Sequence, residues 1–549
     1  MTNRQYQRLE NLLRGVCFGL LGFASTFSHS LVADDAISKR PNVVLIVCDD
    51  LNDYVEGYGG HPQAQTPNMK RLANSGVSFH CAHSNNPVCA PSRSSFLTGI
   101  YGHTSGNLFW AKWFQNPVLK NSKTMMDFFR ENGYHVAGSG KLMHHGRPAE
   151  WDEFKHAADY GPHVFDGSER VAHPSVPLPF GLIGAVDGSF APLSDIPFAK
   201  DDDPSSGWIY GNWRRRTPFR YRGPADRDPT PDERNASWAA GKLKELGKVS
   251  GRPFFLGVGF IRPHTPLHVP KKYFDLFPLS EVQLPLVNPG DEKDTHFAEV
   301  ISEDHKGLRY YRDLTASYAT AEEGLRRFTQ AYLAAVASVD DCIGTVLDAI
   351  DNNPDPSIRD NTIVILTSDH GWNMGEKQFL FKNSPWEEST RVPLIIRAPG
   401  VARAGSVCHR AVSLIDLYPT LTDLCDLEGD TRKNDQGAPL DGYSLKPLMV
   451  DPDRGEWEGP AAALSMIFIG KSPATIDLPQ DVFWSPRSQN WSLRSSDWRY
   501  IRYRDGQEEL YDHRIDPNEW ANLASDPVHL ETLSRLRKQL FQRVPELED

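Results

Sequence analysis

Four stretches of the chain are continuously apolar and rich in β-branched or aromatic residues, a pattern typical of strands buried on both faces of a parallel sheet. These stretches are residues 41–48, 253–261, 362–367 and 392–397. Residues 134–141 predict a further strand that runs into a glycine-containing loop. Helical spacing or capping residues occur around the strands, at residues 66–73, 124–132, 330–350 and 414–424. This alternation predicts βαβ units and therefore an α/β fold.

Residues 147–232 break this pattern, because they are rich in Pro, Gly and Asp and have no clear period. They predict a long insertion that lies over the edge of the sheet. The insertion carries a basic run from Arg214 to Arg222 with aromatic residues in it. This run is either a solvated loop balanced by Asp201 to Asp203 or a surface that binds an anionic chain.

The end of the chain predicts a smaller unit of a different kind. Residues 491–494, 499–503 and 509–512 have the character of short antiparallel strands, and residues 528–544 form an amphipathic helical pattern. We therefore expect a main domain at residues 35–400, which contains the insertion, and a C-terminal α+β subdomain at residues 401–549.

The first 34 residues have the layout of a secretory signal peptide, with three arginines, an apolar run over residues 15–27 and small residues up to Ala33. The apolar run is too short to span a bilayer comfortably. An uncleaved anchor or a buried N-terminal helix is the alternative. We expect an exported protein, periplasmic or secreted, whose mature chain is not stably inserted in a membrane.

Charge and cysteine content narrow the function further. With 59 basic and 71 acidic residues, the 549-residue chain has a formal net charge of −12, which argues against a general nucleic-acid binder. An anionic substrate would need a local basic pocket. The cysteines are sparse, and Cys48 and Cys342 lie in apolar segments typical of reduced core residues. A bridge between Cys408 and Cys425 remains open.

Charged residues follow several of the predicted strands. They are Asp49 and Asp50, Lys141 and His144, His264, and Asp369 with His370. An open α/β sheet gathers the carboxyl ends of its strands into one crevice, so we expect these side chains to meet. Carboxylate oxygens suit a hard divalent cation such as Ca²⁺ or Mg²⁺. Solvated loop acids are the alternative reading of Asp49 and Asp50.

The segment from Asn86 to Gly99 places a cysteine beside the predicted start of a helix. Pro91 fits a first helical turn, and Ser92, Ser94 and Ser95 are predicted to satisfy free amides there. With Arg93 nearby, a group at Cys89 would face a site suited to anions. A thiol nucleophile and a buried core cysteine are the two readings that the segment alone leaves open.

Cys89 to Arg93 has the form Cys-x-Pro-x-Arg, and in this motif the chain resembles the type I sulfatases. The resemblance extends over nearly the whole mature chain. It includes Asp49-Asp50, Gly140-Lys141, Pro263-His264, Asp369-His370-Gly371, Lys382 and the tail from Glu509 to Trp520. The branch that it resembles most contains iduronate-2-sulfatase and its bacterial relatives. Many sulfatases carry Asn where this chain has His370, which makes His370 a less secure metal ligand than the aspartates.

The resemblance implies an alkaline-phosphatase-like fold, with a large mixed and mostly parallel sheet between helices, and a short antiparallel sheet in the C-terminal subdomain. It implies that a formylglycine-generating enzyme oxidises Cys89 to formylglycine. It also implies a cation, Ca²⁺ with Mg²⁺ as the alternative, bound by Asp49, Asp50, Asp369, His370 and the modified Cys89.

The same resemblance implies the remaining roles. Arg93 and Lys141 would hold the aldehyde hydrate, and Lys382 and His264 would bind the substrate. His144 and His264 would move protons, with His145 as the alternative to His144. The expected activity is hydrolysis of sulfate esters on carbohydrate.

Two rival functions are a phosphomonoester or phosphonate hydrolase of the same superfamily and a non-catalytic glycan-binding relative. A Ser or Thr at position 89 would favour the first of these rivals. Loss of metal-binding or basic residues would favour the second, and none of them is lost.

Overall fold

The computed structural model describes residues 40–198, 206–211, 216–246, 251–470 and 480–548. The predicted signal peptide, with its expected export, and the arginines at 214 and 215 lie outside these ranges. Within them, no helix is both long enough and apolar enough to cross a membrane.

The main sheet has eight strands in the order β17-β2-β16-β15-β1-β13-β4-β5. Their bounds are β17 Ser406–Cys408, β2 Val77–Phe79, β16 Leu394–Arg397, β15 Thr362–Ser368, β1 Asn42–Asp49, β13 Phe254–Pro263, β4 His135–Gly140 and β5 Glu153–Phe154. The central strand β1 pairs in parallel with β13 and β15, whereas β16 is antiparallel to both of its neighbours. The predicted mixed, mostly parallel sheet is confirmed.

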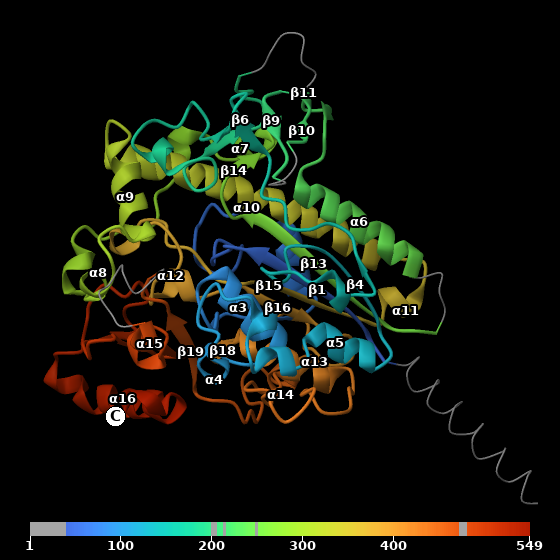
Figure 1. The fold of residues 1–549 in the computed structure, drawn as a ribbon, viewed down its shortest axis with the longest axis vertical. Coiled ribbons are helices and arrows are strands. Elements are labelled where there is room, and N and C mark those ends of the chain that lie inside the picture. Colours follow the sequence, from blue (N-terminus) through green and yellow to red (C-terminus); the bar gives the residue numbers. More distant parts are fainter. Residues whose placement is uncertain (1–39, 199–205, 212–215, 247–250, 471–479, 549) are drawn as a thin grey trace, which may run out of the picture.

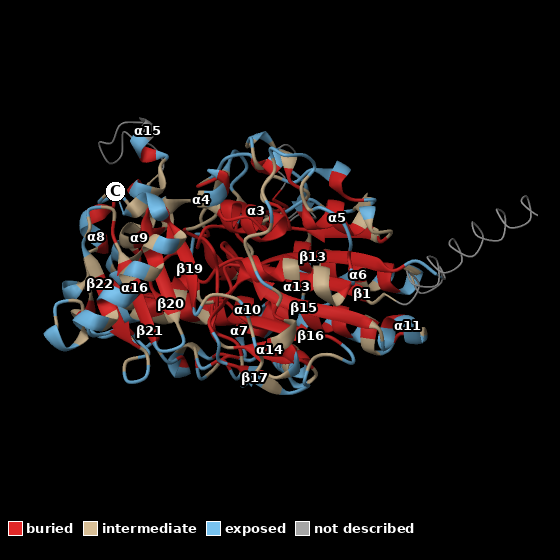
Figure 2. Ribbon diagram, turned by 90° about the horizontal axis from the view of Figure 1, so that it is seen from below, coloured by how far each residue is buried: buried red, intermediate tan, exposed pale blue. Residues whose placement is uncertain are grey.

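Helices cover both faces of this sheet (Figure 1). On one side lie α2 (Pro67–Asn74), α6 (Pro231–Leu246) and α10 (Ala321–Asp351), and on the other lie α3 (Cys89–Thr98), α5 (Met125–Glu131) and α13 (Leu417–Leu424). Alternate residues of β1 divide between the two layers, because Val44 and Ile46 belong to the first core and Val43 and Leu45 to the second. Figure 2 shows that the central strands β1, β13 and β15 are buried along their length. This explains their continuous apolar sequence.

The insertion forms a small structure of its own. Its sheet has the order β10-β9-β6-β7, with β6 at His163–Phe165, β7 at Arg170–Val171, β9 at Trp208–Ile209 and β10 at Pro218–Phe219. Strand β8 (Phe190–Pro192) pairs with β14 (Leu267–Val269). His268 in β14 is fully buried, with Nδ1 2.7 Å from the Pro162 carbonyl and Nε2 2.8 Å from the Ser189 hydroxyl. His268 therefore belongs to the core of this region.

The C-terminal part contains the predicted antiparallel sheet, β19-β20-β21-β22. Its strands are Ala462–Ile467, Asn490–Ser495, Trp498–Arg502 and Glu508–Asp512, and α16 (Leu530–Arg543) packs on them. The domain boundary at residue 400 stays a prediction. Strand β17 follows that position and pairs with β2 in the main sheet. Cys408 and Cys425 are both free thiols, so the bridge left open by the sequence is not formed.

A buried ion-pair network joins the two parts. Arg499 of β21 is fully buried and bonds to the carboxylates of Glu387 and Glu519. Arg494 of β20 also bonds to Glu387, at 3.0 Å. Because Glu387 begins α12 (Glu387–Thr390) in the main part, these charges attach the C-terminal sheet to the region that follows Lys382.

Candidate active site

The predicted strand ends do meet at one edge of the main sheet. Asp49 is the last residue of β1, Lys141 follows β4, and Asp369 follows β15. The approach of β4 to β13 is very close there. A Cβ on Gly140, whose φ is +86°, would lie 1.9 Å from the Gly259 carbonyl oxygen. Glycine at this position therefore allows the turn that brings Lys141 over the end of β1.

Cys89 is the first residue of α3 and is 1% exposed. The prediction that the following serines cap this helix was wrong. Val88 is the N-cap, and no side chain caps the helix. Ser92 instead donates to the Asp369 carbonyl at 2.6 Å, which ties α3 to the end of β15. The tertiary contact outweighs the local preference of serine for free amides.

Four buried side chains of the kinds that bind metals come together around Cys89. Ligand atoms of Asp49, Cys89, Asp369 and His370 all lie within 4.8 Å of one another, and those of Asp49, Asp50 and His264 form an overlapping group. Three acceptors in this cluster have no hydrogen-bond partner: Asp49 Oδ1, Asp50 Oδ2 and His370 Nε2. Unpaired buried acceptors are costly, so this donor set fits a hard divalent cation.

The orientation of His370 suits the same purpose. Its Nδ1 lies 3.0 Å from the Gly371 carbonyl and donates to it, which leaves the lone pair of Nε2 facing the carboxylates. Nε2 is 3.4 Å from Asp50 Oδ1 and 3.6 Å from Asp369 Oδ1. Burial lowers the pKa of His370, so its imidazole is neutral, as a metal ligand must be.

Asp50 is held in an unusual conformation at the centre of the site. Its φ is +64°, in the left-handed region that non-glycine residues seldom adopt. Its Oδ1 accepts from Lys382 Nζ at 2.7 Å, and its Oδ2 lies 3.8 Å from His264 Nε2. Burial, opposed by Lys382, raises the pKa of Asp50 to about 7. A cation beside this carboxylate would restore its charged form.

Arg93 is fully buried, and its guanidinium donates hydrogen bonds to one carboxylate and to three backbone carbonyls. Nε donates to Asp369 Oδ2 at 2.7 Å, Nη2 to the Cys48 carbonyl at 3.2 Å, and Nη1 to the carbonyls of Lys141 and Leu142. These bonds link α3 to three strand ends. Arg93 therefore orients Asp369 and Lys141, and its Nη2 also lies 3.7 Å from Asp49 Oδ1 of the cluster.

Lys141 and Lys382 each pair with one aspartate of the cluster, Asp49 and Asp50 respectively. The Lys141 ammonium bonds to Asp49 Oδ2 and lies 5.0 Å from the centre of the Tyr160 ring. The Lys382 ammonium lies 3.4 Å from Cys89 Sγ. Nearby carboxylates raise the pKa of both lysines despite their burial, so both remain charged.

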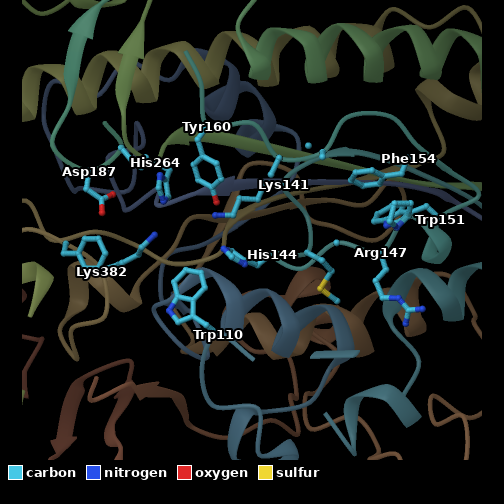
Figure 3. Close-up of a pocket in the computed structure, with 18 of the residues that line it drawn as sticks. Trp110, Lys141, His144, Arg147, Trp151, Phe154, Tyr160, Asp187, His264 and Lys382 are labelled. Carbon is cyan, nitrogen blue, oxygen red and sulfur yellow. The ribbon is translucent and has the colours of Figure 1, made fainter. Parts of the chain in front are cut away.

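A cavity of about 640 Å³ opens above these groups. Lys382, His264 and Asp187 lie at one end, whereas Arg147, Trp151 and Phe154 lie at the other (Figure 3). His144 lines the cavity, and its ring packs edge-on against Trp110 at 4.5 Å. Burial and the Lys141 charge lower the pKa of His144 to about 2. His145 does not line this cavity, so the geometry favours His144.

Several lining residues were missed by the sequence interpretation. They are Trp110, Tyr160, Asp187 and Lys306. Tyr160 and Asp187 come from the insertion and Lys306 from α9 (Lys306–Ala316), and no local pattern marks them. Asp187 accepts from Lys306 at 2.8 Å and from Thr265 Oγ1 at 2.8 Å.

The Thr265 carbonyl in turn fixes His264. It lies 2.6 Å from His264 Nδ1, which donates to it and leaves Nε2 as an acceptor facing Asp50. Asp187 and Thr265 therefore determine which nitrogen of the His264 ring faces the cavity.

A buried cysteine at a helix start, an acidic cluster with two imidazoles and two buried ammonium groups meet at one edge of the sheet. Similarity to known proteins identifies the chain as a sulfuric ester hydrolase. The Sulfatase family model matches residues 41–427, so this chain belongs to the sulfatase family.

Relatives agree over most of the chain. A sulfatase of Formosa agariphila is 32% identical over 495 residues, which cover 89% of this chain and 83% of that protein. Iduronate 2-sulfatase of Mus musculus is 27% identical over 582 residues, covering 94% and 97% respectively.

Solved structures share the fold at lower identity. The phosphonate monoester hydrolase of Agrobacterium radiobacter has a TM-score of 0.66 at 21% identity, covering 92% of this chain and 96% of that one. A protein solved in complex with its substrate D-glucosamine-2-N,6-O-disulfate has a TM-score of 0.64 at 21% identity, covering 93% and 99%.

Proposed function

We propose that this enzyme removes sulfate from a sulfated carbohydrate through a formylglycine made from Cys89. The observation that carries the proposal is the position of Cys89, at the first residue of α3 between the metal-type cluster and the Lys382 ammonium. A nucleophile there would meet the sulfur of a bound sulfate ester with positive charge around it.

Asp49, Asp50, Asp369 and His370 would hold a divalent cation, Ca²⁺ or Mg²⁺, with the oxygen of modified residue 89 as a further ligand. The three unpaired acceptors of this cluster support the assignment. When bound, the cation acts as a Lewis acid on the nucleophile and on the sulfate oxygens. Arg93 would keep Asp369 in place, because its Nε already donates to that carboxylate.

The modification needs an external oxidant and is assigned to a separate formylglycine-generating enzyme. Because Cys89 is 1% exposed in the folded protein, that enzyme would meet the segment before the chain folds. Formylglycine would supply a hydrated aldehyde with two hydroxyl groups. One would form a bond to sulfur as the bond from sulfur to the alcohol oxygen breaks. The second would then lose its proton, re-form the carbonyl group and release sulfate.

Lys382 and Lys141 would neutralise the sulfate oxygens, because both ammonium groups are buried and charged beside Cys89 and Asp49. His264 is neutral with Nε2 free to accept, so it would take a proton from the hydrate and return it to the leaving alcohol. His144 also lines the cavity and would contact the alcohol portion of the substrate.

The carbohydrate substrate is supported by the named relatives and by the charge of the cavity. The whole chain has a net charge of −12, yet Lys141, Lys306, Arg147 and Lys382 all line this one cavity. A sulfated sugar would find local positive charge there without general attraction to the protein. The identity of one relative as an iduronate 2-sulfatase makes a uronate-containing glycan the first substrate to assay. We also propose that the protein acts outside the cytoplasm.

The direct test is mass spectrometry of the peptide that contains Cys89, on protein produced together with a formylglycine-generating enzyme. A peptide lighter by about 18 Da, with sulfate release that disappears in Cys89→Ala, is the expected result. Unmodified cysteine together with undiminished hydrolysis in Cys89→Ala would contradict the mechanism. Assays with 4-nitrophenyl phosphate and phenyl phosphonate esters in parallel test the phosphate-hydrolase alternative.

A further inference from the structure

Four aromatic rings form a continuous row that leads away from the catalytic cavity, and we call this row the aromatic ridge. It consists of Trp110, Phe109, Phe468 and Trp484. The rings of Trp110 and Phe109 meet edge-on at 5.7 Å, those of Phe109 and Phe468 stack at 3.7 Å, and those of Phe468 and Trp484 stack at 6.1 Å. The row crosses from the main part of the chain to the segment after β19.

The two ends of the ridge are exposed although its middle is not. Trp110 is 38% exposed and Trp484 42%, whereas Phe468 is 1% exposed. Val482, beside Trp484, is also 41% exposed. Large apolar side chains that are held by a buried core and still face solvent are characteristic of a ligand-binding surface.

The inner end of the ridge is part of the catalytic cavity. Trp110 lines that cavity and packs against His144, as Figure 3 shows. Asn383, the residue after Lys382, pairs with the peptide groups of Phe468. Its amide nitrogen donates to the Phe468 carbonyl at 2.7 Å and its amide oxygen accepts from the Phe468 nitrogen at 3.0 Å. A rigid connection therefore joins the ridge to the lysine beside Cys89.

We propose that the aromatic ridge binds the sugar residues next to the one that carries the reacting sulfate, so that the substrate is an oligosaccharide. This inference rests on the proposed function. A sugar ring presents C–H groups on its faces, and these pack on an indole ring while its hydroxyl groups stay in water. The ridge begins at the cavity, so a chain that enters the cavity at one end lies on Trp110 and then on Trp484.

The residues of the ridge also explain why the occupant is a sugar chain. The two exposed rings, Trp110 and Trp484, carry no charge, so they add affinity for a sugar ring without requiring a second sulfate at a fixed position. Charge recognition stays inside the cavity, with Lys141 and Lys382. In this arrangement the cavity binds the charged sugar unit that reacts, and the aromatic ridge binds neutral units next to it.

The experiment measures binding and turnover of sulfated oligosaccharides by length. The probes are a disaccharide and a hexasaccharide from heparin, and the same lengths from a sulfated galactan. Calorimetry with Cys89→Ala gives Kd for each probe without turnover, and sulfate release by the active enzyme gives kcat/KM. We expect at least one series to favour the hexasaccharide. Trp484→Ala should reduce that preference about tenfold, because one indole contact is lost.

Trp520→Ala is the matched control, because Trp520 is 39% exposed and lies outside the ridge. It should keep the preference of the parent protein. Equal Kd values for both lengths in both series, or a preference that survives Trp484→Ala, would overturn the inference. A change in sedimentation of Trp484→Ala without a change in sugar binding would also overturn it, since it would assign the ridge to a protein contact.

These outcomes separate the inference from the proposed function. If the protein binds the hexasaccharide through Trp484 but releases no sulfate from any probe, the proposed function fails and the ridge stands. If it releases sulfate equally from both lengths and Trp484→Ala changes nothing, the proposed function stands and the ridge fails.

Discussion

The ammonium group of Lys382 lies 3.4 Å from the sulfur of Cys89 and 2.7 Å from Asp50 Oδ1. It is buried with both partners, so its charge acts in a medium that screens little. The positive charge of Lys382 therefore acts both on residue 89 and on the acidic cluster.

Lys382→Met should lower kcat/KM for sulfate esters by about 10²–10³-fold, because a positive charge aimed at the reacting sulfate is lost. Lys306→Met removes a lysine from the same cavity that pairs with Asp187 and does not contact Cys89. It should raise KM more than it lowers kcat. Steady-state kinetics of both variants measure these effects. Equal losses of kcat/KM in the two variants would contradict a direct role of Lys382 at the reacting sulfate.

Removing a divalent cation should destabilise the protein, independently of the state of residue 89. Asp49 Oδ1, Asp50 Oδ2 and His370 Nε2 are buried without hydrogen-bond partners, so a cation that binds them stabilises the folded state by about 2.7 kcal/mol at a hundred times its Kd. Thermal unfolding of Cys89→Ala with a chelator, then with Ca²⁺ or Mg²⁺, measures this. Asp369→Asn should weaken the response, and a melting temperature unaffected by chelator and cation alike would refute the metal site.

Arg499→Met should cost about 3–5 kcal/mol, because it leaves Glu387 and Glu519 buried next to one another with less compensating charge. Denaturant unfolding followed by tryptophan fluorescence gives the free energy of unfolding. Arg359→Met is the control, since its side chain is 41% exposed and that of its partner Asp360 is 59% exposed. We expect a change of less than about 1 kcal/mol there. Similar losses of unfolding free energy in the two variants would show that the buried network stabilises the fold no more than a surface ion pair does.

Acid should weaken the fold around the insertion. Burial lowers the pKa of His268 well below its ordinary value, so the unfolded chain binds a proton that the folded protein does not. The stability from neutral His268 is therefore complete above about pH 6.5 and is lost as the pH falls below it, by up to about 1.4 kcal/mol per pH unit. His268→Gln should flatten the fall in unfolding free energy between pH 7.5 and pH 5. An unchanged slope would assign the acid sensitivity to other groups.

Much of the site follows from local sequence. The strands are apolar runs because they are buried on both faces. Asp49 ends one of these strands, and Lys141, His264 and Asp369 directly follow others. Parallel strands place such residues at one edge whatever the details of packing. The Cys-x-Pro-x-Arg motif at Cys89 is likewise a short segment that can be recognised without knowing its neighbours.

Other features depended on contacts between distant segments. Ser92 was expected to cap α3, yet it bonds to the Asp369 carbonyl, 277 positions away. Arg93 was expected to hold the nucleophile, which stays a prediction, and the structure adds that it also bonds to three strand ends. The sequence by itself determined the strands, the residues that follow them and the family motif, because these depend on burial period and chain order. Only the tertiary structure decided that Tyr160, Asp187 and Lys306 join the cavity and that Phe468 meets Phe109, because no local sequence pattern in these segments records which distant segment they pack against.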